Sequence, residues 1–142
     1  MVTHFVLAFF ATTGFCLVFN VPRREFAFCG MVGALGWIVY QLALLATGGG
    51  IVSVFFAAMA IAYLSRVLSF WRKMPINLFM IPGVIPLVPG VGIYYTMLYT
   101  ISGENAAALM RGIETLMVAG VISIGLLIVL SLPRGLFGGR RK

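Results

Sequence analysis

Long runs of apolar residues, each nearly free of charge, are the feature that most restricts what this chain can fold into. An α-helix rises about 1.5 Å per residue, so about 20 apolar residues cross the hydrocarbon core of a bilayer. Inside lipid the backbone polar groups must find partners within the protein, which helices achieve within one segment. We therefore expect about five transmembrane helices, over residues 2–19, 26–47, 51–71, 76–100 and 115–132.

The composition supports an all-α integral membrane protein. Of the 142 residues, 62% are hydrophobic and 9% are charged, whereas a soluble domain carries about 25% charged residues. We predict one transmembrane domain over residues 1–132, followed by a basic cytoplasmic tail at 133–142. The first apolar run lacks a preceding basic region, and Arg23 and Arg24 follow it instead. This order differs from that of a cleaved signal peptide, so the run is expected to remain as a helix.

The net charge of +7 comes from ten Lys and Arg against three acidic residues, Glu25, Glu104 and Glu114. A nucleic-acid binder gathers basic residues on one polar face, whereas here they form short clusters between apolar runs, as topology signals do. We therefore expect no nucleic-acid partner. With five spans, Arg111 stands alone on one side, and the other side holds Arg23, Arg24, Arg72, Lys73, Arg134, Arg140, Arg141 and Lys142.

This bias predicts a multi-pass protein of the cytoplasmic (inner) membrane, with the N-terminus outside and the C-terminus in the cytoplasm. A four-span alternative treats residues 76–100 as a re-entrant segment. That alternative divides the basic clusters between the two faces of the membrane, which makes it the weaker hypothesis.

The fourth apolar segment contains three prolines and three glycines between Pro82 and Gly92. Each proline removes a backbone N–H and clashes with the preceding helical turn, so a continuous regular helix is not expected. Irregular backbone at membrane depth is tolerated where protein buries it or water reaches it, and transporters use such breaks as binding sites. One hypothesis is thus a broken, functional helix. The other is a kinked structural helix whose glycines permit close packing.

Several short motifs resemble one family. They are Asn20-Val21-Pro22 after Gly14-Phe15-Cys16-Leu17-Val18-Phe19, then Gly33-Ala34-Leu35-Gly36, and Pro86-Leu87-Val88-Pro89-Gly90 followed by Tyr94. Together they resemble the threonine/serine exporter family, in the YjjB-like type that corresponds to the C-terminal half of the full-length exporter. The resemblance implies export of small hydroxy amino acids or dicarboxylates, and a second membrane subunit similar to the N-terminal half. A carrier or pore built from copies of this chain alone, and a non-transporting scaffold, remain alternatives.

The broken segment and its surroundings supply the candidate residues of a path for a small anionic or zwitterionic solute. They are Asn77, Pro82, Pro86, Pro89, Gly90, Tyr94 and Arg66. Asn77 is a polar group at the start of the segment, and Tyr94 either anchors at the membrane interface or points into the path. Arg66 is the one charge well inside a predicted helix; it either snorkels to the interface or attracts an anionic solute.

Other residues are assigned to packing. Gly30, Gly33 and Gly36 recur every three residues and form a smooth stripe for close helix contact. Cys16 and Cys29 have no metal-binding or redox spacing and are expected to pack as small hydrophobic residues. Gln41 is expected to face the bundle interior, whereas His4 is expected to be solvated.

No enzymatic signature stands out. The sequence offers no paired acids, no Cys–His pairing and no metal cluster, and Gly90-Val91-Gly92 is not a nucleotide fingerprint. We expect no catalysis, no metal and no cofactor. No carboxylate falls within an apolar run, so any proton coupling would depend on Glu25, Glu104, Glu114 or a residue of the partner.

Overall fold

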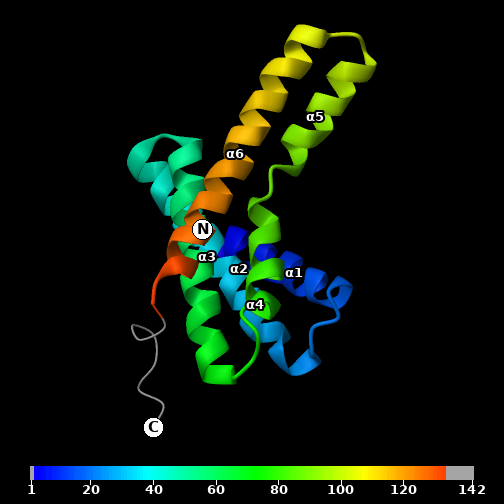
Figure 1. Ribbon diagram of the computed structural model, residues 1–142. Coiled ribbons are helices and arrows are strands. Elements are labelled where there is room, and N and C mark those ends of the chain that lie inside the picture. Colours follow the sequence, from blue (N-terminus) through cyan, green and yellow to red (C-terminus); the bar gives the residue numbers. More distant parts are fainter. Residues whose placement is uncertain (1, 134–142) are drawn as a thin grey trace.

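The computed structural model of the chain describes residues 2–133, and over that range every regular element is a helix (Figure 1). The predicted tail beyond residue 133 lies outside the described residues. The α-helices are α1 Val2–Val18, α2 Phe26–Thr47, α3 Gly50–Arg72, α4 Asn77–Val84, α5 Gly90–Ile101 and α6 Asn105–Ser131. Two short 3₁₀ helices, η1 Arg23–Glu25 and η2 Ile85–Leu87, precede α2 and follow α4.

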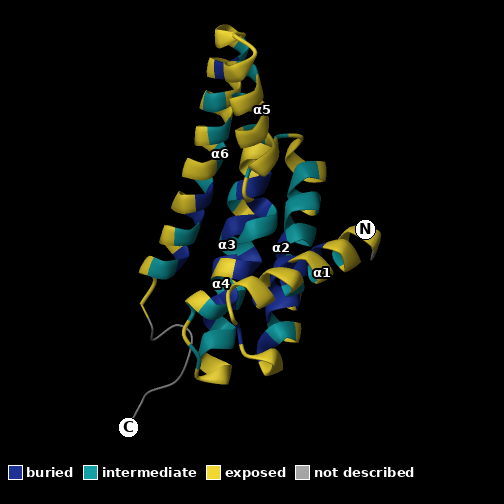
Figure 2. Ribbon diagram, turned by 90° about the vertical axis from the view of Figure 1, so that its right-hand side faces the viewer, coloured by how far each residue is buried: buried dark blue, intermediate teal, exposed yellow. Residues whose placement is uncertain are grey.

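Three helical segments are long and apolar enough to cross a membrane, namely Arg23–Thr47, Gly50–Arg72 and Asn105–Ser131. Asn77–Leu87 and Gly90–Ile101, bent by 52° at the break between them, add a fourth candidate when the pair is counted as one span. The all-helical prediction is confirmed, with three to four candidate spans. At 17 residues, α1 is about 26 Å long and runs obliquely across the other helices (Figure 2). The fifth crossing therefore stays a prediction.

Most of the polar stretch at residues 102–114 belongs to α6. α6 begins at Asn105, ten residues before the predicted span boundary at 115. Ala106, Ala107 and Ala108 favour helix strongly, and Arg111 pairs with Glu114 at 2.9 Å along the helix surface. Residue 115 thus marks where the charge-free part of α6 starts, and the helix itself extends a further three turns.

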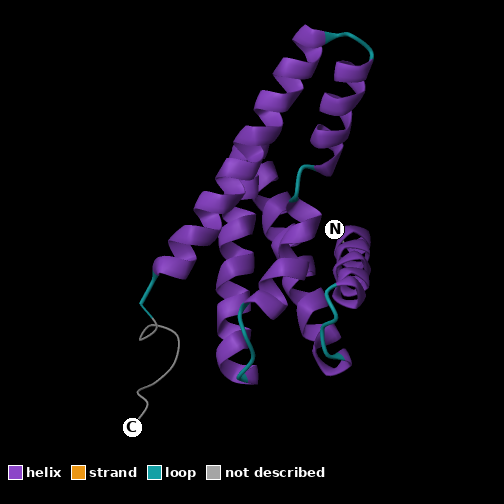
Figure 3. Cartoon of the chain, turned by 45° about the vertical axis from the view of Figure 1, so that its right-hand side comes forward, coloured by secondary structure: helices purple, strands orange, loops and turns teal. Residues whose placement is uncertain are grey.

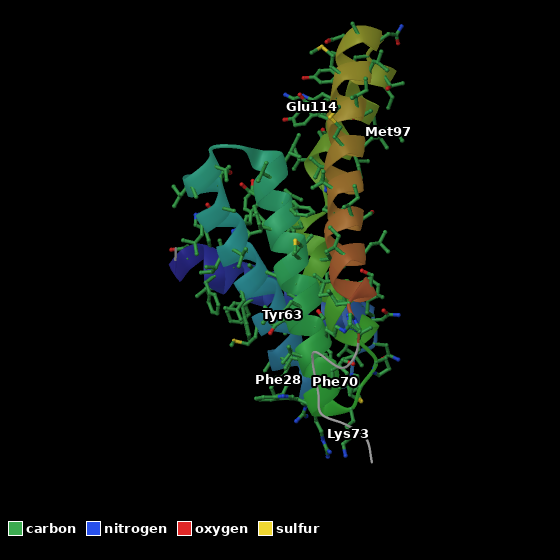
Figure 4. The ribbon with its side chains drawn as sticks, turned by 60° about the vertical axis from the view of Figure 1, so that its left-hand side comes forward. Phe28, Tyr63, Phe70, Lys73, Met97 and Glu114 are labelled. Carbon is green, nitrogen blue, oxygen red and sulfur yellow. The ribbon has the colours of Figure 1, made fainter. Side chains whose placement is uncertain are left out.

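The helices alternate in direction, so their ends gather at two levels. α2 and α4 start, and α3 ends, at the same end of the molecule, where Lys73 is labelled in Figure 4. Glu25 and Arg72 tie α2 to α3 there, with Arg72 donating two hydrogen bonds to Glu25 Oε1 and one to Oε2, the shortest at 2.6 Å. Arg72 also lies 4.7 Å from the ring of Phe28. The basic residues at the ends of α2 and α3 therefore share one side.

The core lies where α2, α3 and α4 meet. Val32, Ile61 and Phe79 are essentially inaccessible to solvent and come from these three helices in turn. Gly83 of α4 allows the close approach, because a Cβ there would lie 2.9 Å from Val32 and 3.3 Å from Ile61. This core fixes the position of α4, and with it the start of the broken segment.

A two-helix projection leaves this bundle, formed by α5 and residues 105–117 of α6; we call it the arm (Figure 3). Gly125 of α6 packs against Ala58 and the Phe55 carbonyl of α3. From that contact α3 continues only to Gly50, about 12 Å, whereas α6 continues to Asn105, about 30 Å. The arm therefore extends roughly 18 Å beyond the end of α3.

Candidate functional site

The broken segment is a true interruption of the backbone. α4 ends at Val84, η2 makes a single 3₁₀ turn, and Val88 is extended at φ −60° and ψ 132° before α5 starts. Pro86 and Pro89 have no N–H to donate, which prevents a regular helix from continuing through them. Two short-range bonds hold the connection instead, from the Val88 N–H to the Ile85 carbonyl at 3.0 Å and from the Gly90 N–H to the Val88 carbonyl at 2.7 Å.

The first turn of α5 follows directly from this connection. The Ile93 N–H donates to the Pro89 carbonyl at 3.1 Å, and within the described part of the chain the Val91 and Gly92 N–H groups donate no hydrogen bond across the break. Such leading N–H groups carry the positive end of the helix dipole. Around Gly90 there is open space, because a Cβ built on it would meet no atom within 4 Å.

A pocket of about 240 Å³ opens beside the break. Its walls come from three elements, with His4, Leu7, Ala8 and Ala11 on α1, Trp37 on α2 and Pro86 on η2. Pockets that hold drug-sized ligands measure about 300–1,000 Å³, so this one suits a smaller solute. One polar side chain, one large aromatic ring and an apolar floor make it a mixed surface.

Comparison with known families identifies the class of protein. The family model described as "Threonine/Serine exporter, ThrE" matches residues 4–132. The chain belongs to the threonine/serine exporter family. The predicted family is thereby confirmed, and the chain is a multi-pass membrane protein of a transporter family rather than an enzyme. No solved structure matches the chain.

In this exporter-family chain, only part of the predicted path comes together. Pro86 lines the pocket, and Pro89 and Gly90 follow it in the interrupted backbone. Pro82 is fully buried inside α4 and faces the core. Asn77 is exposed at the start of α4, at the basic end of the molecule. Tyr94 lies on the arm, exposed, with its ring 5.4 Å from that of Tyr95.

Arg66 has a defined structural contact. Its side chain is buried and its guanidinium donates hydrogen bonds to the carbonyls of Val129, Leu130 and Leu132, the Leu130 bond at 3.3 Å. These carbonyls end α6, where the last turn lacks intrahelical donors and the helix dipole is negative. Arg66 thus caps α6 from α3, a role that neither sequence-based hypothesis included, and we leave it out of the path proposed below.

The glycines of α2 lie at close helix contacts. A Cβ on Gly30 would lie 2.6 Å from Thr13 Oγ1, and one on Gly33 would overlap Thr12 Oγ1 of the same helix, α1. A Cβ on Gly36 would overlap the side chain of Ile61 on α3. One glycine stripe therefore admits α1 on one side and α3 on the other.

His4 and Trp37 are the pocket residues that sequence patterns did not single out. His4 stands near the N-terminus, where the sequence predicts a solvated side chain. It lines the pocket together with Pro86 because α1 runs obliquely across the other helices. Trp37 had one available signal: it lies four residues before Gln41, so both occupy one face of α2. The buried polar groups also include Ser65, whose Oγ has no hydrogen-bond partner among the described residues.

Proposed function

We propose that the chain forms one half of a small-solute exporter and that the pocket beside the broken segment is its part of the substrate site. The pocket supports this most directly, because it joins the interrupted backbone at Pro86 to a polar and an aromatic side chain, His4 and Trp37. Family membership supplies the substrate class, hydroxy amino acids such as threonine and serine. Dicarboxylates are the second class implied by the resemblance.

The chemistry of an amino acid fits the groups around the break. Its carboxylate is an acceptor for the leading N–H groups of α5, those of Val91 and Gly92, at the positive end of the helix dipole. Its short side chain packs against Trp37 and Pro86. Pro89 and Gly90 hold the backbone open between these two surfaces, and Tyr94 lies one turn further along α5.

The second half of the exporter is a separate membrane subunit in this proposal. Two features favour it: the pocket is open on one side, and no carboxylate lies among its lining residues to carry a proton. In the proposed topology the chain crosses the membrane five times with its N-terminus outside. A second subunit with the opposite orientation then gives an inverted-repeat arrangement, which allows one half to rock against the other.

The decisive experiment is efflux from loaded vesicles that contain the chain alone, the second subunit alone, or both. Labelled threonine, serine and succinate are the solutes. We expect efflux only with both subunits, reduced by roughly tenfold, or about 1.4 kcal/mol, in Trp37→Ala. The matched control is Leu45→Ala, on the same helix and 78% exposed. Efflux from the chain alone supports a homo-oligomeric carrier instead, and no efflux with both subunits supports a scaffold.

A further inference from the structure

The pocket beside the break contains an ionisable side chain. Among the described residues that line it, His4 alone is titratable, and the others are Leu7, Ala8, Ala11, Trp37 and Pro86. Imidazole is the side chain whose charge ordinarily changes between pH 5 and pH 8. The charge of the pocket lining in this pH range therefore depends on His4.

Other titratable and charged groups on α1 and on the elements packed against it lie away from the pocket. Cys16 on α1 and Cys29 on α2 are buried, and Tyr40 of α2 is not among the lining residues. α4 and η2, over residues 77–87, contain no titratable side chain. The charged turn at residues 23–25 precedes the pocket wall of α2 by roughly 18 Å along the helix. No fixed charge therefore masks a change of charge on His4.

Two polar groups of the pocket lining are unused by the protein itself. Among the described residues, neither the His4 imidazole nor the Trp37 indole N–H takes part in a hydrogen bond or an ion pair. A neutral imidazole has one donor and one acceptor, a charged imidazole has donors only, and an indole is a donor only. The side chains of the lining therefore accept a hydrogen bond from a solute only while His4 is neutral.

We propose that His4 makes amino-acid binding in this pocket dependent on pH, because a proton on the imidazole excludes the solute. This inference rests on the function proposed above, in which the carboxylate of the amino acid lies toward α5. Its ammonium and hydroxyl groups are then left for the pocket lining. In a space of about 240 Å³, a solute held between Trp37 and Pro86 also contacts His4, which lines the same space.

The two charge states of His4 favour different solutes. The neutral imidazole accepts a hydrogen bond from the ammonium or hydroxyl group of threonine or serine. The imidazolium repels that ammonium, and no carboxylate in the lining neutralises it. A solute without an ammonium group, such as a dicarboxylate, is attracted by the same positive charge. Neutral His4 thus selects amino acids, and charged His4 selects anions.

The test measures threonine binding to the full chain with its second subunit in lipid nanodiscs, at pH 7.5 and pH 5.5. Threonine keeps both of its charges in this range, so any change in affinity reports on the protein. We expect the wild-type affinity to fall roughly tenfold in acid. His4→Gln keeps a donor and an acceptor but never ionises, so it should bind equally at both pH values.

Two controls accompany the binding test. Thr3→Ala changes the residue beside His4, which does not line the pocket, and should follow the wild type. The solute control is 3-hydroxybutyrate, which is threonine without its ammonium group. It should lose no affinity in acid, because the imidazolium attracts its carboxylate and meets no opposing positive charge.

A second measurement detects the same exclusion in the chain alone. In Trp71→Phe, Trp37 is the remaining one of the two tryptophans, and a charged imidazole in contact with an indole quenches its emission more strongly than a neutral one. We expect the emission of Trp37 to fall between pH 7.5 and pH 5.5, and saturating threonine to move that fall to lower pH. With His4→Gln added, the emission should stay constant.

The outcomes separate this inference from the proposed function. Threonine binding or Trp37 emission with the same pH dependence in His4→Gln and the wild type overturns the role of His4 and leaves the substrate site standing. Absence of threonine binding at both pH values overturns the proposed function, and this inference with it.

Discussion

At the contact between α1 and α2, two glycines of α2 each face a threonine of α1. Gly30 and Gly33 provide the space, and Thr13 and Thr12 fill it. The three-residue spacing of these glycines was sufficient to predict a packing stripe, since positions three apart share a helix face. The spacing could not predict which helix packs against this stripe, because that depends on the angle at which α1 crosses α2.

Gly33→Ala tests this contact. The added methyl would overlap Thr12 Oγ1, so we expect a loss of about 1–3 kcal/mol in the free energy of unfolding, as in other overpacked sites. Gly14→Ala is the control, because a Cβ there meets nothing within 4 Å and alanine favours helix. Thermal unfolding in detergent, followed by loss of the monodisperse peak, measures both. Equal melting temperatures for the two variants would contradict the assignment.

Arg66 illustrates the limit of sequence reasoning at one residue. A lone charge inside an apolar run indicated either an interface group or a substrate contact, and its actual partners lie more than sixty residues away. No local sequence pattern indicates that the last turn of α6 lies beside α3. The carbonyl cap follows only from the tertiary arrangement.

Arg66→Leu separates the capping role from a transport role. Removing a charged donor from carbonyl partners at a helix end is expected to cost about 1–3 kcal/mol, whereas Arg66→Lys keeps part of the interaction with the dipole. The melting temperature should therefore fall most in Arg66→Leu, and efflux per folded protein should remain. A stable Arg66→Leu protein with no efflux would instead place Arg66 in the path.

At the scale of elements, the broken segment was the most predictable part of the site. Prolines at positions 82, 86 and 89 predicted an interruption, and the helix is interrupted at the last two of them. Pro82 lies inside α4, where it cannot donate to the Leu78 carbonyl, and the Cys29 thiol donates to that carbonyl at 3.4 Å instead. The wall opposite the break, on α1, was not predictable because it depends on how a distant helix packs.

Pro86→Ala and Pro22→Ala form a matched pair for the break. Restoring an N–H at position 86 favours a longer, straighter α4, which would displace the wall of the pocket. We expect efflux to fall by roughly tenfold, or about 1.4 kcal/mol, with membrane levels unchanged. Pro22 lies exposed before η1, so its substitution should leave efflux intact. Vesicle transport normalised to protein amount is the measurement; unchanged efflux in Pro86→Ala would assign the break to structure alone.

For the whole molecule, hydropathy and basic residues predicted an all-helical membrane protein, and the arrangement of the ends agrees with one basic side. Arg23 and Arg24 precede α2 and Arg72 ends α3 at the end where Lys73 lies, and Arg111 pairs with Glu114 on the arm at the other end. The number of membrane crossings depends on α1. Composition alone could not predict the length of this helix or its oblique orientation.

The position of the N-terminus decides between five crossings and four. Five crossings place the N-terminus and a label after residue 142 on opposite sides of the membrane, and a label in the α5–α6 loop at Gly103 on the same side as the N-terminus. Accessibility of single introduced cysteines to an impermeant reagent in intact cells measures all three positions. An N-terminus on the same side as the C-terminus would show that α1 does not cross.

The hydroxyl groups between α1 and α2 have a mechanical consequence. Thr12 and Thr13 donate to the Ala8 and Phe9 carbonyls of their own helix at 2.8 and 2.7 Å. At the glycines of α2 they therefore make van der Waals contacts and donate no hydrogen bond. When α1 and α2 separate or slide at this contact, both threonine hydroxyls keep their hydrogen bonds within α1. Between α3 and α6, by contrast, movement must pull Arg66 from three carbonyls. The α1–α2 contact can therefore shift at these glycines without losing a threonine hydrogen bond, whereas the α3–α6 contact is held by the hydrogen bonds of Arg66.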